Sequence, residues 1–127
     1  MIGYQMVGTN NFEKSAAFYD ALMGEMGASR MMQDDKFIAW TGSPTETAFC
    51  ICKPHDGETA TTGNGVMTAF MVESPAMVDK IYAKALELGA TDEGAAGPRG
   101  EDSFYAGYFR DLDGNKCNVF HMEMPSA

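Results

Sequence analysis

The sequence predicts an α+β fold made of two similar halves, and three observations support this. Both halves show the same order of predicted elements, which is a strand, a helix and three further strands. A small, polar and glycine-rich stretch, residues 56–65, lies near the middle of the 127-residue chain. Shifting the chain by half its length, 63 residues, places Phe18-Tyr19 on Ile81-Tyr82. We therefore expect a single domain with these parts: module one at 1–55, a linker at 56–64 and module two at 65–127.

The first half begins with a weakly alternating strand over residues 3–9. A helix is predicted over 12–23, because apolar residues recur there on one helical face. Asn10, with Glu13 three residues later, is expected to cap this helix. The remaining strands of this half are expected at 28–33, 36–40 and 47–53.

The second half begins with a predicted strand over residues 65–73. Ser74 is expected to cap a second helix that has Pro75 at its first position and ends at Gly89. Further strands are predicted at 91–93, 104–110 and 116–122, with a charged loop at 98–102 and a turn at 111–115.

Composition excludes several classes of function. Nine Lys and Arg residues face eighteen Asp and Glu residues, and the net charge of −9 repels nucleic acids and anionic membranes. No apolar run approaches the length of about 20 residues that a membrane span needs, and the first ten residues do not predict a signal peptide. The three cysteines are an odd number, which favours a reducing cytoplasm. The eleven methionines are expected to be mostly core filler.

One segment carries a family resemblance. Residues 108–116, Tyr-Phe-Arg-Asp-Leu-Asp-Gly-Asn-Lys, resemble the penultimate turn of the vicinal oxygen chelate superfamily, which includes glyoxalase I, the bleomycin-resistance proteins and the extradiol dioxygenases. Residues 6–15 with Phe18-Tyr19 resemble its opening strand and helix. The resemblance implies two βαβββ modules that form a curved mixed sheet around a cleft, with the helices on the outer face. It does not imply one reaction, because the superfamily hosts several chemistries.

The resemblance also implies four positions for metal ligands, usually His, Gln or Glu, on the first and last strands of each module. They fall on Tyr4, Cys50 (with Cys52 as the alternative), Met67 and Asn118. This set does not suit a hard divalent ion, because it offers a thioether, a neutral amide and a phenol whose ordinary pKa is about 10. We therefore expect neither a family-type metal nor another cofactor. A soft Cu(I) site made by Cys50, Cys52 and Met67 is an alternative.

The interpretation that follows is a metal-free member of the superfamily that binds an apolar or aromatic small molecule in the cleft. The candidate ligand-binding residues are Tyr4, Trp40, Cys50, Cys52, Met67, Tyr105 and Asn118. An alternative is a glyoxalase-like lyase, of lactoylglutathione-lyase type, or an isomerase, with an atypical metal site or acid–base chemistry by Tyr4. The resemblance further implies a homodimer, and we expect no nucleic-acid or membrane partner.

The candidate catalytic residues are Tyr4 and Cys50. A nucleophilic cysteine needs a base, which is usually a histidine. His121 is not an obvious partner, because strand alternation places it on the face opposite Asn118. Buried, inert thiols are therefore favoured over a nucleophile. Tyr4, Met67 and Asn118 are expected to share one cleft.

Overall fold

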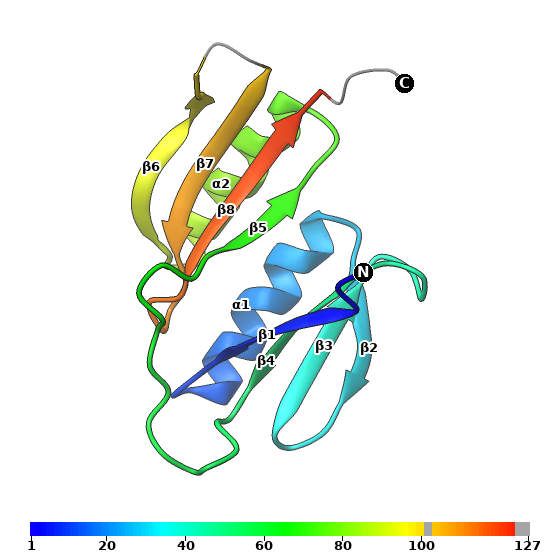
Figure 1. The fold of residues 1–127 in the computed structure, drawn as a ribbon, viewed down its shortest axis with the longest axis vertical. Coiled ribbons are helices and arrows are strands. Elements are labelled where there is room, and N and C mark those ends of the chain that lie inside the picture. Colours follow the sequence, from blue (N-terminus) through cyan, green and yellow to red (C-terminus); the bar gives the residue numbers. More distant parts are fainter. Residues whose placement is uncertain (101–102, 124–127) are drawn as a thin grey trace. The chain divides into compact units, whose positions relative to one another are not determined.

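The computed structural model describes residues 1–100 and 103–123. The chain divides into two units, residues 1–63 and 64–127. Each unit has the element order βαβββ and contains one four-stranded mixed sheet with a helix against one of its faces (Figure 1). The predicted α+β class, with two βαβββ modules, is confirmed. Residues 101 and 102 of the predicted charged loop lie outside the described residues.

Unit 1 places its first and last strands side by side. Its elements are β1 (Tyr4–Gly8), α1 (Phe12–Glu25), β2 (Ser29–Gln33), β3 (Phe37–Thr41) and β4 (Ala48–Cys52). The strand order is β1-β4-β3-β2, with β1 parallel to β4 and the other pairs antiparallel. The core lies between this sheet and α1, where the Tyr19 ring lies 4.7 Å from Phe49 and 5.8 Å from Trp40.

Trp40 is fixed to α1 by a hydrogen bond as well as by packing. Its Nε1 donates to Asp20 Oδ1 at 2.9 Å, and the side chain is 1% exposed. Asp20 also accepts two hydrogen bonds from the guanidinium of Arg30 on β2, at 2.8 and 2.6 Å. These bonds from Arg30, joined by the bond from Trp40, hold the pKa of Asp20 below its ordinary value. These hydrogen bonds hold α1 against the face of the sheet that carries Trp40.

Unit 2 repeats this arrangement. Its elements are β5 (Thr68–Met71), α2 (Pro75–Glu87), β6 (Thr91–Pro98), β7 (Phe104–Arg110) and β8 (Lys116–Met122). The strand order is β5-β8-β7-β6, with only β5 and β8 parallel among the pairs. Ser74 caps α2 as predicted, since its hydroxyl accepts from the Met77 amide at 3.1 Å. The helix buries Val78, Ile81 and Ala85.

Strand β6 is longer than the predicted strand 91–93. It continues to Pro98 through two irregularities in its pairing with β7, one between Asp92 and Gly94 and one between Gly94 and Gly97. Gly94 has a φ of +156°, which other residues rarely adopt. The glycines that make this stretch look like a loop in the sequence are the residues that let the strand bulge and continue.

The turn between β7 and β8 is organised by one carboxylate. Asp111 is 4% exposed, and its Oδ1 accepts from the amides of Asp113 and Asn115, both at 2.9 Å. Arg110 donates to the carbonyl oxygen of Gly114, also at 2.9 Å. Arg110 and Asp111 therefore hold the turn, and the segment that carries the family resemblance has a structural role here.

The cap of α1 differs from the expectation. The N-cap residue is Asn11, whose side chain accepts from the Lys14 amide at 3.1 Å. Asn10 is instead bound to the linker, because its side chain exchanges two hydrogen bonds with the backbone of Ala60, at 2.7 and 3.0 Å. The prediction of Asn10 was wrong by one residue. The two adjacent asparagines have the same capping propensity, and a contact 50 residues away decides between them.

Exchanging these two asparagines for alanine should give different local effects. Asn11→Ala should destabilise the protein by about 1 kcal/mol and speed hydrogen exchange at the Lys14 amide. Asn10→Ala should speed exchange at the Ala60 amide and leave Lys14 unchanged. Amide exchange followed by NMR measures both, and faster exchange at Lys14 in the Asn10 variant would contradict the assignment.

Most methionines of the described residues are not core filler. Seven of them are exposed, namely Met1, Met6, Met31, Met32, Met67, Met71 and Met122, whereas Met23 is buried. Flexible thioethers therefore contribute to the surface of both units, where they suit adaptable contacts. Within the described residues, no helix is both long and apolar enough to cross a membrane.

Candidate functional site

The face of each sheet that points away from its helix is called its open face. In unit 1 it can be assigned from the register, because Trp40 and Phe49 are paired and both contact α1. Side chains alternate along a strand, so Cys50 and Cys52 lie on the open face. Through the parallel pairing of β1 with β4, the open face also carries Tyr4 and Met6.

Four of the predicted site residues of unit 1 divide between the two faces. Tyr4, Cys50 and Cys52 share the open face, where Tyr4 is 66% exposed. Trp40 lies on the opposite face, against α1, and its indole N–H is already bound to Asp20. The structure therefore does not bring Trp40 together with the other three.

The two thiols of the open face are held in their neutral form. Cys50 is 2% exposed and Cys52 is half-buried. Burial raises the pKa of both thiols, and the neighbouring Cys52 raises the pKa of Cys50 further. Neither cysteine has the electropositive surroundings that activate a nucleophile, so the geometry supports inert thiols in the absence of a bound ion.

The open face of unit 2 carries Asn118. The hydroxyl of Tyr105 on β7 donates to Asp79 on α2 at 2.7 Å, so Tyr105 faces the helix. Its partner across the β7–β8 pair is His121, which shares that face, and Asn118 with its own partner Tyr108 lies on the other. Tyr105 is therefore separated from Asn118 by the sheet. Met67 is exposed and directly precedes β5.

Asn118 has an unusual environment. The residue is 2% exposed, and its side-chain oxygen Oδ1 has no hydrogen-bond partner. Among the residues that the structure describes, it is the one buried side-chain oxygen or nitrogen in this state. Leaving a buried acceptor unpaired costs about 1–3 kcal/mol. Such a group on the open face is a candidate for binding a donor that the chain itself does not supply.

The surroundings of Asn118 combine apolar and charged groups. Phe104 and Phe120 lie on the same open face, with ring centroids 5.5 Å apart. The ring centre of Tyr108 lies 5.5 Å from the Arg99 guanidinium and 5.8 Å from the Lys116 ammonium. Sequence reasoning missed Tyr108, although the predicted turn at 111–115 was a signal for it: the hairpin pairs Arg110 with Lys116 and therefore Tyr108 with Asn118.

The four positions that the family resemblance assigns to metal ligands do not fit a divalent ion. Met67 offers only a thioether and Asn118 offers only a neutral carbonyl oxygen. Within the described residues, no three His, Cys, Asp or Glu side chains are grouped to hold a metal. Mg²⁺ and Mn²⁺ require carboxylate oxygens, and Zn²⁺ requires imidazole or thiolate. The donor set therefore gives no step through a family-type metal ion.

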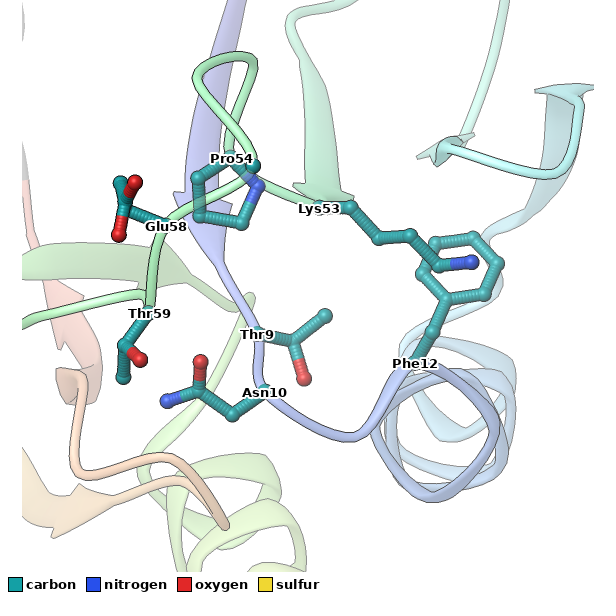
Figure 2. A pocket seen from close by; sticks show the side chains of 8 residues that line it. Thr9, Asn10, Phe12, Lys53, Pro54, Glu58 and Thr59 are labelled. Carbon is teal, nitrogen blue, oxygen red and sulfur yellow. The ribbon is translucent and has the colours of Figure 1, made fainter.

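A surface hollow of about 360 Å³ lies in unit 1 at the end of β1 (Figure 2). Its lining consists of Thr9, Asn10, Phe12, Lys53, Pro54, Gly57, Glu58 and Thr59. Two of its polar side chains already have internal partners: the Thr9 hydroxyl accepts from the Asn11 amide at 3.1 Å, and the Lys53 ammonium lies 5.3 Å from the centre of the Phe12 ring. The hollow joins the linker to the start of α1, and none of the predicted site residues lines it.

Comparison with known proteins identifies the family. Residues 1–119 match the Glyoxalase/Bleomycin resistance protein/Dioxygenase superfamily. The chain belongs to this superfamily. A solved structure of a glyoxalase/bleomycin resistance protein from Albidiferax ferrireducens T118 is 35% identical, with a TM-score of 0.88, and the alignment covers 97% of this chain and 99% of that one.

More distant members share the superfamily fold. A glyoxalase/bleomycin resistance protein/dioxygenase family enzyme from Burkholderia phytofirmans PsJN is 19% identical, with a TM-score of 0.75 and coverage of 95% of this chain and 98% of that one. A lactoylglutathione lyase from Agrobacterium tumefaciens is 17% identical, with a TM-score of 0.70 and coverage of 95% and 92%. At such identities the likeness shows the fold alone. The comparison with curated protein sequences gave no match.

Proposed function

We propose that this superfamily member binds an apolar or aromatic small molecule and works without a divalent metal ion. The observation that carries the proposal is the buried, unpaired Oδ1 of Asn118 on the open face of unit 2. The superfamily resemblance implies a metal ligand at this position. An amide in its place exchanges a charged metal ligand for a neutral hydrogen-bonding group.

The ligand proposed for this site has an O–H or N–H group that donates to Asn118 Oδ1. Its apolar part lies against the phenylalanine pair of the same face, where Met71, 67% exposed, adds a flexible apolar side chain. The Tyr108 ring already lies against two cations, so we assign it to the edge of the site rather than to stacking with the ligand. The prediction that Tyr4, Met67 and Asn118 share one cleft rests on the family resemblance alone.

Localisation and assembly complete the proposal. The three free cysteines support a reducing compartment, which we take to be the cytoplasm. A homodimer is supported by the family resemblance alone. Sedimentation velocity of the purified full chain tests the dimer, and a monomer at all concentrations would contradict it.

The binding experiment uses matched pairs of aromatic probes that differ in one donor, phenol with anisole and indole with N-methylindole. We expect phenol and indole to shift the side-chain NMR signals of Asn118 and to raise the melting temperature, and the methylated partners to do neither. Equal effects within each pair would contradict the role of Asn118. Absence of binding by all four would contradict the aromatic ligand class.

The rival interpretation, a glyoxalase-type lyase, is tested on the same preparation. The protein is loaded with Ni²⁺, Zn²⁺, Mn²⁺ or Fe²⁺, its metal content is measured by mass spectrometry, and turnover of methylglyoxal with glutathione is followed. We expect no stoichiometric divalent ion and no turnover. One retained equivalent together with turnover would overturn the proposal in favour of the enzyme.

A further inference from the structure

Three sulfur-bearing side chains lie next to one another on the open face of unit 1. The parallel pairing of β1 with β4 places Met6 directly beside Cys50, and Cys52 follows two residues along β4 on the same face. Neighbouring strands lie about 4.8 Å apart, and residues i and i+2 of a strand about 7 Å apart. The three side chains therefore begin within reach of one bound ion.

The donor chemistry of this group is uniform. Both cysteines are free thiols, and the third donor is a thioether. Thiolate and thioether sulfur are soft ligands that select Cu(I) over hard divalent ions. The sequence alone suggested Met67 of the other unit as the thioether. The register supplies one within unit 1, on the strand adjacent to both thiols.

We propose that Met6, Cys50 and Cys52 form a three-sulfur binding site for Cu(I). The site goes beyond the proposed function and does not involve Asn118 or unit 2, so its failure would leave the ligand-binding proposal unchanged.

The surroundings provide both shelter and access. Cys50 is 2% exposed, and its neighbours on the open face, Ala39 across the β3–β4 pair and Ala48 along β4, carry only methyl groups. Cys52 is half-buried and Met6 is 42% exposed. An incoming ion therefore meets the exposed thioether first and the sheltered thiol last, and the small neighbours add no bulky side chain over Cys50.

Binding requires no oxidant or reductant. Each thiol loses its proton as a sulfur–copper bond forms, so one Cu(I) ion releases two protons and leaves an anionic dithiolate complex. Met6 adds a neutral lone pair, and copper stays in the monovalent state throughout. Because the ordinary pKa of a cysteine thiol is about 8.5, free thiols are protonated at neutral pH, and their proton release on binding is measurable.

The test titrates the full chain anaerobically with Cu(I) against a chromophoric Cu(I) chelator, with Ag(I) as a redox-inert second probe. We expect one tightly held equivalent, ultraviolet absorption from thiolate-to-copper charge transfer, and release of two protons for each ion. Cys50→Ser and Cys52→Ser should each abolish the tight equivalent. Met6→Leu, which preserves the side-chain volume, should weaken it by about tenfold.

Two control variants address sulfur that lies outside the proposed site. Met31→Leu removes another exposed thioether, and Cys117→Ala removes the thiol that faces α2. Both should bind Cu(I) as the unaltered chain does, with circular dichroism confirming the fold of every variant. The proposal is overturned if the chelator retains all the copper, if either serine variant keeps its equivalent, or if Met6→Leu and Met31→Leu bind alike.

Discussion

Replacing Asn118 with leucine should make the free protein more stable and abolish its binding of hydrogen-bond donors. Leucine nearly matches asparagine in shape but has no acceptor that burial leaves unpaired. Since the Oδ1 atom of Asn118 lacks a partner, its removal should recover the cost of desolvation. We expect the free energy of unfolding to rise by about 1–3 kcal/mol, measured by urea denaturation.

Asn118→Ala is the matched control. It removes the same oxygen but leaves a void, and a void in a packed region loses van der Waals contacts. Its stability should therefore lie below that of Asn118→Leu, while both variants lose the rise in melting temperature that phenol and indole cause in the unaltered chain. A less stable leucine variant would show that the amide oxygen has a partner in the folded chain and would remove the basis of the site.

A gain in stability joined to a loss of binding has a specific meaning. Replacing a residue that is kept for packing destabilises the protein. A residue that is kept for binding often lowers the stability of the free protein, so its replacement can raise that stability. Asn118 lies between Ala69 and Tyr108 on neighbouring strands, in a sheet whose other buried groups are apolar or paired. Its presence there is better explained by an occupant of the open face than by the fold.

The fold was predictable because its signals are local. Ser74 with Pro75, and the carboxylate-rich turn that follows Arg110, lie in the structure where their sequence patterns place them. The prediction of Asn10 as the cap of α1 was wrong for the opposite reason, because the linker residue that binds Asn10 lies far away in the sequence. Local propensity does not encode such a contact.

The candidate site was predictable only in part. Alternation correctly places Cys50 and Cys52 on one face and His121 opposite Asn118. It does not say which face meets the helix. For Trp40 and Tyr105 that choice depends on Asp20 and Asp79, acceptors on the helices that the aromatic donors reach across 20 and 26 residues of chain. An aromatic residue on a strand looks the same in the sequence on either face.

Gly107→Ala tests the other side of the same sheet and should be clearly destabilising. Gly107 lies on β7 facing α2, and a Cβ atom there would lie 2.9 Å from Tyr82 Cδ1 and 3.0 Å from its Cγ. These atoms belong to the base of the ring, which has little freedom to move. The far end of the ring is also held, because the Tyr82 hydroxyl donates to Asp92 at 2.7 Å. Burial and the contact with Asp92 raise the pKa of Tyr82 to about 12, so the phenol stays protonated and keeps donating.

The added methyl group must therefore move α2 or break the bond to Asp92. Overpacking of this kind costs about 1–3 kcal/mol, and urea denaturation measures it. Gly24→Ala is the matched control, because Gly24 lies in α1 and a Cβ atom added there would meet nothing within 4 Å. It should stabilise the protein by about 0.5–1 kcal/mol through helix propensity alone.

A double-mutant cycle attributes the cost to the ring. In a Tyr82→Ala background the ring atoms that crowd Gly107 are gone, and Gly107→Ala should then cost little. The two substitutions should be strongly non-additive, with the second one less harmful in the presence of the first. Additive effects would show that Gly107 is required by the backbone of β7 and that the approach of α2 to the sheet is not set by this contact.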